Sequence, residues 1–429
     1  MRLGGRLAAA IEVIDDIEKR HRPAADALKD WGLSHRFAGA GDRAAIGNIV
    51  YDALRRKRSA AWLVGADTSR ALGFGALILE WGQTPASLDA AFAGDRFAPE
   101  PLSAEEREGI AARDLARAPD VVRADCPDWC VPHLREAFDD DWVAETAALS
   151  GRPPLDLRVN PLRASRERVV GELAGTGAAA TALAPFGIRI PPIAGAGRHP
   201  NVQAEPAFQK GWFEVQDEGS QIVADLAGAR PGMQVLDFCA GAGGKTLAFS
   251  AAMDDRGQVF AHDSDKSRLA PIFERLRRAG SRNVQVVAKP AELAPLAGAM
   301  DLVVIDAPCT GAGTWRRRPD AKWRLSARQL EARVAEQAAI LDAATAYVKP
   351  GGRLCYITCS VFAEENARQV AAFLGRHPGF AAADHAALWE GRYPGKAAAV
   401  RIEPGLGIVL GPLRTGTDGF FFAALDRRG

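Results

Sequence analysis

The stretch that decides the fold is residues 233–246, MQVLDFCAGAGGKT, where a short apolar run enters a glycine-rich turn and a helix pattern follows. Glycine lets a backbone approach a ligand closely, and a turn between a strand and a helix favours an anionic or cofactor ligand. The turn is neither a Walker loop nor a dinucleotide fingerprint, because Cys239 and Thr246 stand where those motifs need glycine. A tight turn without a ligand is the alternative interpretation.

The same alternation of strands and helices continues through the rest of the chain. Ser326 and Gln329 form a capping box at the start of one long helix. The alternation predicts a doubly wound α/β sheet, in which ligands bind at the carboxyl ends of the strands. The predicted strands are 257–263, 283–288, 301–306 and 352–360, and the predicted helices are 266–280 and 326–348.

Length and composition limit the class of protein. A chain of 429 residues, 48% hydrophobic and 25% charged, is globular and long enough for two or three domains. Its net charge of +1 means that any nucleic-acid surface must come from local clusters of Lys and Arg. Cys126 and Cys130 show no zinc spacing, so we expect reduced thiols, no metal and a cytoplasmic protein. We expect no signal peptide and no membrane span.

The N-terminal part has the apolar spacing of amphipathic helices. Helices are predicted in the first 20 residues, at 42–58 and at 69–82, with apolar stripes such as Leu7, Ile11, Ile14 and Ile17. The second helix pattern ends in four cations, Arg55 to Arg58. We interpret this run as a solvated helix end stabilised by the helix dipole, and a phosphate contact is the alternative.

An acid follows the second strand of the sheet. Asp263 ends the run 257–263, some 26 residues after Asp237. An acid at the end of the second strand commonly holds ribose hydroxyls, so Asp263 and the glycine-rich turn together predict an adenosine-containing cofactor. The alternative is an acid that stabilises a helix N-terminus.

Two thiols follow two other strands. Cys309 comes just after the strand 301–306, and Cys359 follows the strand "RLCYIT". Each alone is more often a small buried hydrophobe, as we expect for Cys355 and Cys239, but both should emerge at one edge of the sheet. A thiolate that adds to carbon 6 of a pyrimidine makes carbon 5 a nucleophile, and a base must later remove the carbon-5 proton. Asp306 can activate the ring, and the residues leave open which thiol attacks.

Several motifs resemble those of the Sun/Fmu-type RNA 5-methylcytosine methyltransferases. They are "RVNPLR", "VQDEGSQ", "DFCAGAGGKT", "DAPCTGAGTWRRRPDAKW", "ITCSVFAEEN" and "DGFFFAAL". The resemblance implies a Rossmann-like catalytic domain that uses S-adenosyl-L-methionine. The N-terminal part is similar to the NusB-like helical extension of bacterial small-subunit rRNA methyltransferases.

The resemblance also implies roles for single residues. Cys359 would attack carbon 6, Cys309 would assist release, and Asp306 would contact the cytosine beside the cofactor. Trp315 and Arg316 to Arg318 would stack a base and grip phosphates. Ala242 stands where the family usually has proline, and Lys289 where it usually has an acid. The implied cofactor contacts are Cys239, Ala240, Gly241, Ala242, Gly243, Gly244, Lys245, Asp263, Lys289 and Asp306.

The expected organisation has three parts: 1–140, a helical NusB-like RNA-binding domain; 141–215, a small α+β RNA-recognition or linking region; and 216–429, the methyltransferase domain. The expected function is methylation of carbon 5 of a cytosine in 16S rRNA by a monomer, with the base flipped or single-stranded. The alternatives are the same chemistry on tRNA or another rRNA site, or a non-catalytic RNA-binding ribosome assembly factor.

Overall fold

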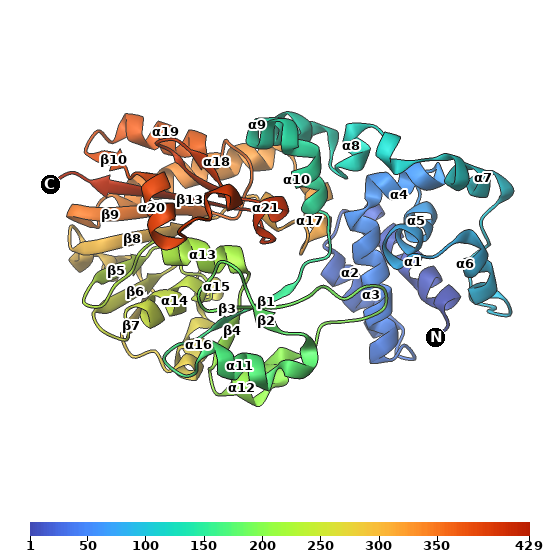
Figure 1. Cartoon of the computed structure of the whole chain (residues 1–429), viewed down its shortest axis with the longest axis horizontal. Helices are drawn as coiled ribbons and strands as arrows, with labels where there is room; N and C mark the ends of the chain where they lie inside the picture. The colour runs from blue at the N-terminus through green and yellow to red at the C-terminus, as the bar shows by residue number, and fades with distance from the viewer. The chain divides into compact units, whose positions relative to one another are not determined.

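The computed structural model describes residues 1–429, apart from the side chain of Pro290. The chain forms two compact units (Figure 1). The helical unit comprises Met1–Pro153, Pro192–His199 and Trp315–Leu325, and the sheet unit comprises Pro154–Pro191, Pro200–Thr314 and Ser326–Gly429. This division differs from the three expected parts: residues 141–153 pack with the helices, and most of 154–215 packs with the large sheet.

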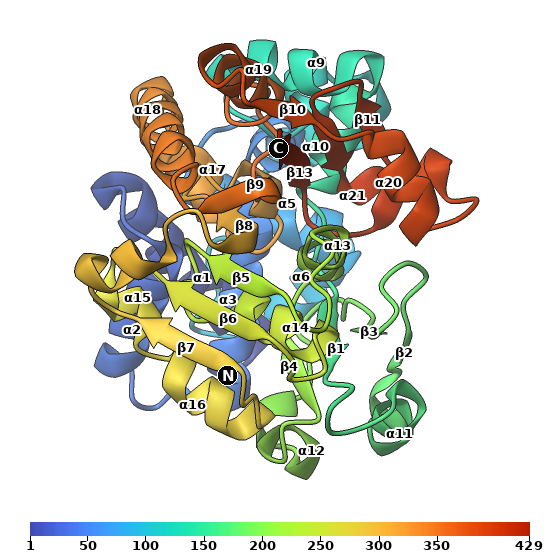
Figure 2. The ribbon, with the colours of Figure 1, turned by 90° about the vertical axis from the view of Figure 1, so that its left-hand side faces the viewer.

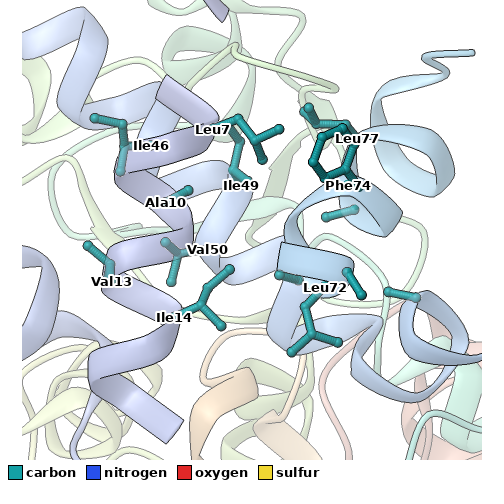
Figure 3. Packing of buried hydrophobic residues seen from close by; sticks show 14 of the residues in the cluster. Leu7, Ala10, Val13, Ile14, Ile46, Ile49, Val50, Leu72, Phe74 and Leu77 are labelled. Atoms are coloured by element: carbon teal, nitrogen blue, oxygen red, sulfur yellow. The ribbon is translucent and has the colours of Figure 1, made fainter. Parts of the chain in front are cut away.

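The helical unit is built around α1, α3 and α5, whose apolar stripes meet in one core. Leu7 and Ile14 of α1 and Ile49 and Val50 of α3 are fully buried and point toward one another (Figure 3). Among the described residues, no helix is both long and apolar enough to cross a membrane. The α-helices are α1 (Leu3–Arg20), α2 (Ala24–Ser34), α3 (Ala40–Arg55), α4 (Lys57–Val64), α5 (Ser69–Trp81), α6 (Pro85–Phe92), α7 (Ala104–Ala112), α8 (Asp120–Arg123), α9 (Val131–Phe138), α10 (Trp142–Ala148) and α17 (Pro319–Arg324).

The basic run at 55–58 is not the solvated helix end that its sequence indicates. The predicted helix 42–58 stops at Arg55, and α4 begins at Lys57, so the run lies at the corner between two helices. Arg55 is only 8% exposed. Each cation pairs with an acid of the same unit, so none is an unpaired phosphate ligand; the pairs are Arg55–Asp52, Arg56–Glu80, Lys57–Glu18 and Arg58–Asp128.

The sheet unit contains, within the described residues, a nine-stranded sheet in the order β11-β12-β13-β9-β8-β5-β6-β7, with β10 paired to β13. Strands β9, β8, β5, β6 and β7 are parallel, and the order reverses between β5 and β8 (Figure 2). Such a reversal opens a crevice at the carboxyl ends of the strands. The predicted Rossmann-like fold is therefore confirmed. The strands are β5 (Gln234–Asp237), β6 (Gln258–His262), β7 (Val284–Val287), β8 (Met300–Asp306), β9 (Val348–Thr358), β10 (Phe380–Ala382), β11 (Arg401–Glu403), β12 (Gly407–Leu410) and β13 (Phe420–Arg427).

The helices of this unit follow the sequence pattern with one exception. The predicted capping box of Ser326 and Gln329 begins α18. The predicted helix 266–280 is broken into two pieces at Pro271, because proline has no N–H to donate to the preceding turn. The helices are α13 (Glu218–Leu226), α14 (Gly244–Ala252), α15 (Lys266–Leu269), α16 (Ile272–Ala279), α18 (Ala327–Ala344), α19 (Ala367–Arg376), α20 (His385–Arg392) and α21 (Pro412–Thr415).

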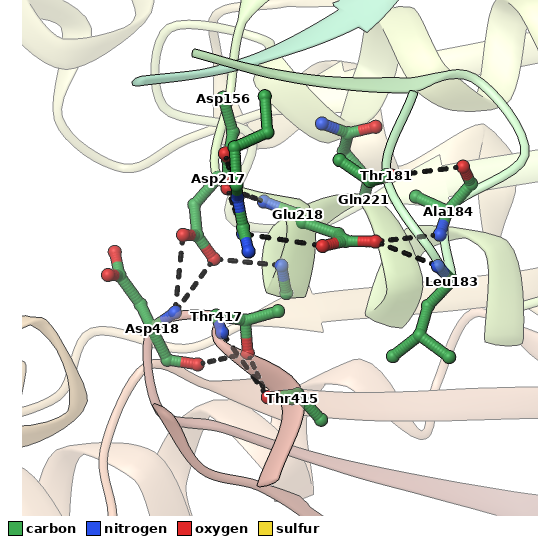
Figure 4. Close-up of polar contacts among 12 residues, drawn as sticks. Asp156, Thr181, Leu183, Ala184, Asp217, Glu218, Gln221, Thr415, Thr417 and Asp418 are labelled. Carbon is green, nitrogen blue, oxygen red and sulfur yellow. Dashed lines mark hydrogen bonds and ion pairs between the residues drawn. The ribbon is translucent and has the colours of Figure 1, made fainter. Parts of the chain in front are cut away.

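A four-stranded antiparallel sheet packs in the same unit, in the order β2-β3-β1-β4. Its Asp156 accepts a hydrogen bond from the Glu218 backbone at the start of α13, at 3.0 Å (Figure 4). Asp217 caps α13 and accepts a second bond from the Asp418 amide, at 3.1 Å, just before β13. The hydrogen bonds of Asp156 and Asp217 therefore connect the small sheet, α13 and the start of β13. The elements are β1 (Leu155–Val159), α11 (Arg166–Glu172), β2 (Ala179–Ala180), β3 (Gly187–Ile190), α12 (Pro206–Gln209) and β4 (Phe213–Val215).

Candidate active site

The glycine-rich turn joins the ends of β5 and β6. The Gly241 amide donates to Oδ2 of Asp263 at 2.9 Å. Gly243 has a φ of +81°, and a Cβ there would lie 2.5 Å from the Ile272 side chain of α16. Glycine at 243 is therefore required both by the backbone conformation and by the packing of α16 on the turn.

Two carboxylates lie beneath this turn. Asp263 is 3% exposed, and each of its oxygens accepts one backbone bond, from Gly241 and from Asp265. Asp237 accepts a bond from the Thr246 hydroxyl at 2.6 Å through Oδ2. Its Oδ1 is buried and has no hydrogen-bond partner among the described residues. Carboxylate oxygens accept more than one bond each, so both acids fit a ligand that brings hydroxyl donors or positive charge.

Burial, with a smaller contribution from the nearby carboxylates Asp306 and Asp263, raises the pKa of Asp237 to about 7, although the Thr246 hydroxyl and Lys245 oppose the shift. Burial disfavours the ionised carboxylate, and like charges act in the same direction. Because ionisation of Asp237 is costly, a ligand that brings a hydrogen-bond donor or a positive charge would stabilise its ionised form. The residues present therefore fit an adenosine-containing cofactor with a positively charged centre.

Asp306 forms an ion pair with Lys245 at the end of β8. Nζ of Lys245 lies 2.6 Å from Oδ2 of Asp306, and the Lys245 side chain is only 6% exposed, whereas that of Asp306 is 35% exposed. The ammonium also lies 5.6 Å from the centre of the Phe420 ring. The expected neutralisation of acids by Lys245 is thus seen directly, and Asp306 is the more open member of the pair.

Two other residues that the sequence predicts as cofactor contacts, Lys289 and Cys239, lie in different surroundings. Lys289 is exposed and follows β7, and its amide lies 3.4 Å from Oε2 of Glu292. Cys239 lies in the turn after β5, where burial strongly raises the pKa of its thiol. A thiol that stays protonated is a poor nucleophile, which agrees with the packing role expected for it.

Cys309 and Cys359 meet at the carboxyl edge of the sheet. Their sulfur atoms lie 3.4 Å apart, although fifty residues separate them in the chain. The parallel register pairs Asp306 of β8 with Ile357 of β9, so each thiol emerges just beyond its own strand. The Gly313 amide donates to the Cys359 carbonyl at 2.9 Å. This bond connects the loop after Cys309 to the end of β9.

The two thiols form a coupled pair with an unequal environment. The hydrogen bond to Cys359 raises the pKa of Cys309, and burial and the charges of Cys359 and Glu365 raise it further, against a backbone bond from Gly311. Cys355 is fully buried within β9, as expected, and burial raises its pKa to about 12. Of the thiols on β8, β9 and the loops that follow them, Cys309 and Cys359 are therefore the two that lie together and partly exposed.

Of the aromatic and basic loop residues, Trp315 and Arg316 are buried, whereas Arg318 is exposed. Trp315 is 1% exposed and Arg316 is 5% exposed, and both belong to the helical unit. The Arg316 carbonyl accepts two bonds from the Arg55 guanidinium, at 3.1 and 2.9 Å. A buried indole cannot stack a base, so the role expected for Trp315 is wrong in this structure.

Sequence reasoning missed one buried acid beside the thiols. Glu365 is fully buried and accepts bonds from the amide and hydroxyl of Thr310, at 2.8 and 2.5 Å. It lies inside the quoted motif "ITCSVFAEEN", but nothing local distinguishes it from its neighbour Glu364. Only its burial next to Cys309 marks it out.

Comparisons with known proteins agree with this geometry. Residues 226–426 match the family model "16S rRNA methyltransferase RsmB/F", and residues 126–192 match the model of the ferredoxin-like domain of the same methyltransferases. The chain is 35% identical over 267 residues to a probable ribosomal RNA small subunit methyltransferase B of Synechocystis sp., covering 58% of this chain and 56% of the relative. It is 34% identical over 313 residues to the ribosomal RNA small subunit methyltransferase B of Erwinia tasmaniensis, covering 70% and 66%.

Solved structures share the fold. The crystal structure of PH0851 aligns with a TM-score of 0.73 and 24% identity, covering 100% of both chains. NSun6 from Pyrococcus horikoshii with SFG aligns with a TM-score of 0.61 and 21% identity, covering 71% of this chain and 98% of that one. The matches to the first curated relatives span 56%, 58% and 66% of their lengths. The sheet topology, the paired thiols and the matched family model together show that this chain belongs to the 16S rRNA methyltransferase RsmB/F family.

Proposed function

We propose that this protein methylates carbon 5 of a cytosine in 16S rRNA, with S-adenosyl-L-methionine as the methyl donor. The observation that carries the proposal is the 3.4 Å separation of the Cys309 and Cys359 sulfurs beside the Asp306 carboxylate. Methylation of an unreactive ring carbon needs a nucleophile, a ring-activating group and a second acid or base, and these three residues supply them. The substrate class rests on the relatives and the family model, whose names specify small-subunit rRNA.

In the proposed reaction, the Cys359 thiolate forms a bond to carbon 6, and the electron pair of the 5,6 double bond moves toward carbon 5. Asp306, once it has taken up a proton, donates it to ring nitrogen 3 as carbon 6 is attacked, which neutralises the negative charge that develops there, and takes the proton back when the double bond re-forms. The cofactor, when bound, supplies the methyl group that carbon 5 takes. Cys309, as the thiolate, then removes the carbon-5 proton, the double bond re-forms, and the bond between carbon 6 and Cys359 breaks. A stacked base cannot reach these groups, so the cytosine is flipped or single-stranded.

The residues that would hold the cofactor are those of the turn from Cys239 to Lys245. Asp263 would accept the ribose hydroxyls, Asp306 would lie near the positive centre, and Lys289 would lie on the adenine side. An rRNA substrate implies action in the cytoplasm, and we propose a monomer.

The test is methyl transfer from labelled S-adenosyl-L-methionine to unmodified 16S rRNA, followed by mapping of the methylated position. We expect Cys359→Ala to abolish transfer and Cys309→Ala to accumulate a covalent protein–RNA adduct. An adduct with Cys359→Ala but not with Cys309→Ala would reverse the two roles. Transfer to tRNA alone would change the substrate, and no transfer to either RNA would overturn the proposal in favour of a non-catalytic assembly factor.

A further inference from the structure

The site contains two similar thiols, and their surroundings must determine which of them ionises first. Cys309 and Cys359 share a contact of 3.4 Å, and both are partly exposed. Two thiols this close do not ionise independently, because the first thiolate opposes the second. The first proton to leave therefore leaves one anion and one thiol, and the surroundings select the sulfur that keeps the proton.

Hydrogen bonds connect Glu365 to the chain on both sides of Cys309, directly on one side and through Gln337 on the other. Its carboxylate accepts the Thr310 amide at 2.8 Å and the Thr310 hydroxyl at 2.5 Å, directly after the thiol. On the other side, Gln337 of α18 donates to Oε1 of Glu365 at 2.9 Å and to the Pro308 carbonyl at 3.0 Å. Thr310, after Cys309, is thus bonded to the carboxylate directly, and Pro308, before it, is linked to the carboxylate through Gln337.

That carboxylate is buried and is not neutralised by a cation. Glu365 is fully buried, and within the described part of the chain no Lys or Arg side chain forms an ion pair with it. Three uncharged donors hold it instead: the amide and hydroxyl of Thr310 and the side chain of Gln337. The Thr310 bonds place this carboxylate next to the Cys309 loop, and its charge is one of the causes that raise the pKa of the Cys309 thiol.

The other titratable groups around the thiols do not reverse this asymmetry. Tyr356 of β9 donates its hydroxyl to the Glu365 carbonyl at 2.7 Å. Burial raises the pKa of Tyr356 well above its usual value, so it stays neutral. Lys245 is engaged by Asp306, and Cys239 is kept protonated by burial.

We propose that Glu365 is a positioning residue that gives the two thiols different roles. It fixes the Cys309 loop and favours the protonated form of Cys309, so that Cys359 is the thiol that ionises first. This inference rests on the proposed function, which assigns the roles of the two thiols. It gives a physical reason why Cys359 attacks, which the sequence alone left open. The hydrogen bond to Cys359 and burial raise the pKa of Cys309 most, and the charges of Cys359 and Glu365 raise it further, in agreement with this assignment.

The same arrangement sets the order of the proton transfers. When Cys359 ionises, its proton leaves to solvent and the Cys309 proton points toward the new thiolate. Once Cys359 has bonded to carbon 6, its sulfur is a neutral thioether, and one of the two charges that opposed ionisation of Cys309 is gone. Cys309 can then give its proton to solvent, and the resulting thiolate takes the proton from carbon 5. The electron pair of the carbon-5–hydrogen bond re-forms the 5,6 double bond, and Cys359 leaves carbon 6 as the thiolate.

The test is alkylation of the full-length protein by iodoacetamide over a pH series, with each cysteine-containing peptide quantified by mass spectrometry. In the unmodified protein, Cys359 should react at a lower pH than Cys309. In a Cys359→Ala background, Glu365→Gln should lower the midpoint for Cys309 by about one pH unit, because the amide keeps the shape and removes the charge. Glu364→Gln is the matched control and should leave the midpoint unchanged.

Reaction of Cys309 before Cys359 in the unmodified protein would overturn the proposal without any substitution at 365. So would an unchanged Cys309 midpoint in Glu365→Gln, provided that the variant keeps the circular dichroism spectrum of its parent. In the methyl-transfer reaction, the pH dependence of adduct release should move to lower pH in Glu365→Gln, with the KM for cofactor unchanged. Alkylation needs no RNA, so its outcome is separate from any failure of the proposed function.

Discussion

Nζ of Lys245 and Oδ2 of Asp306 lie 2.6 Å apart at the carboxyl edge of the sheet, and the lysine is almost completely buried while the acid is partly open. The pair joins the glycine-rich turn, which carries the cofactor in our proposal, to the strand that precedes Cys309. The first prediction concerns the acid. Asp306→Asn should lower kcat for methyl transfer by about 10²–10³-fold, as removal of one stabilising group for developing charge commonly does.

The matched control for this substitution is Asp301→Asn, at the opposite end of the same strand, where the acid pairs with Lys349. It should leave kcat within a few-fold of the unmodified enzyme. Single-turnover methylation assays of both variants check the prediction. Equal rates for Asp306→Asn and the unmodified enzyme would remove Asp306 from the mechanism.

The second prediction concerns Gly243. Gly243→Ala forces a side chain into positive φ and places its Cβ 2.5 Å from Ile272, whereas Gly232→Ala meets the same kind of backbone strain, at φ +90°, with nothing within 4 Å. We expect Gly243→Ala to lower the free energy of unfolding by about 1–3 kcal/mol more than Gly232→Ala, because overpacking adds to strain. Urea unfolding of the two variants measures the difference, and calorimetry should show weaker binding of S-adenosylhomocysteine only for Gly243→Ala. Equal losses in both variants would mean that α16 shifts freely.

The third prediction concerns pH. The pKa of Asp237 is raised to about 7 in the folded protein, so the folded state binds a proton more tightly than the unfolded chain does. Its contribution to the free energy of unfolding is therefore complete below about pH 4 and is lost as the pH rises toward 7, a change on the order of a few kcal/mol. Asp237→Asn cannot ionise, so its stability should fall less between pH 5 and pH 8. Urea unfolding at both pH values compares the proteins, and parallel pH dependences would contradict the prediction.

The fourth prediction concerns the segment Trp315–Leu325 in the helical unit. The Arg55 guanidinium holds the Arg316 carbonyl, and the indole of Trp323 donates to the Leu54 carbonyl at 2.7 Å. Arg55→Ala should release the backbone at Arg316 and Arg317 and speed trypsin cleavage after these two residues by about tenfold, for a loss near 1.4 kcal/mol from two bonds. Arg117→Ala, at a side chain that is 89% exposed, is the control. Limited proteolysis with mass spectrometry gives the rates, and unchanged cleavage at 316–318 would show that other contacts hold the segment.

The sequence by itself determined the elements and their order. Patterns at 233–239 and 301–306 predicted β5 and β8, and the capping box at Ser326 predicted where α18 begins. These signals are local, because periodic burial and capping hydrogen bonds involve residues a few positions apart. From them it also followed that Cys309 and Cys359 would emerge at one edge of the sheet.

Only the tertiary structure decided the surroundings of those residues. The contact of 3.4 Å between the thiols and the ion pairs of Arg56, Lys57 and Arg58 join positions far apart in the chain, and the burial of Trp315 depends on such packing too. Glu365 and Glu364 are adjacent and identical in sequence, yet only Glu365 flanks Cys309, through its bonds to Thr310 and Gln337. Charge and burial depend on which elements pack together, and that packing is fixed by long-range contacts that no local pattern records.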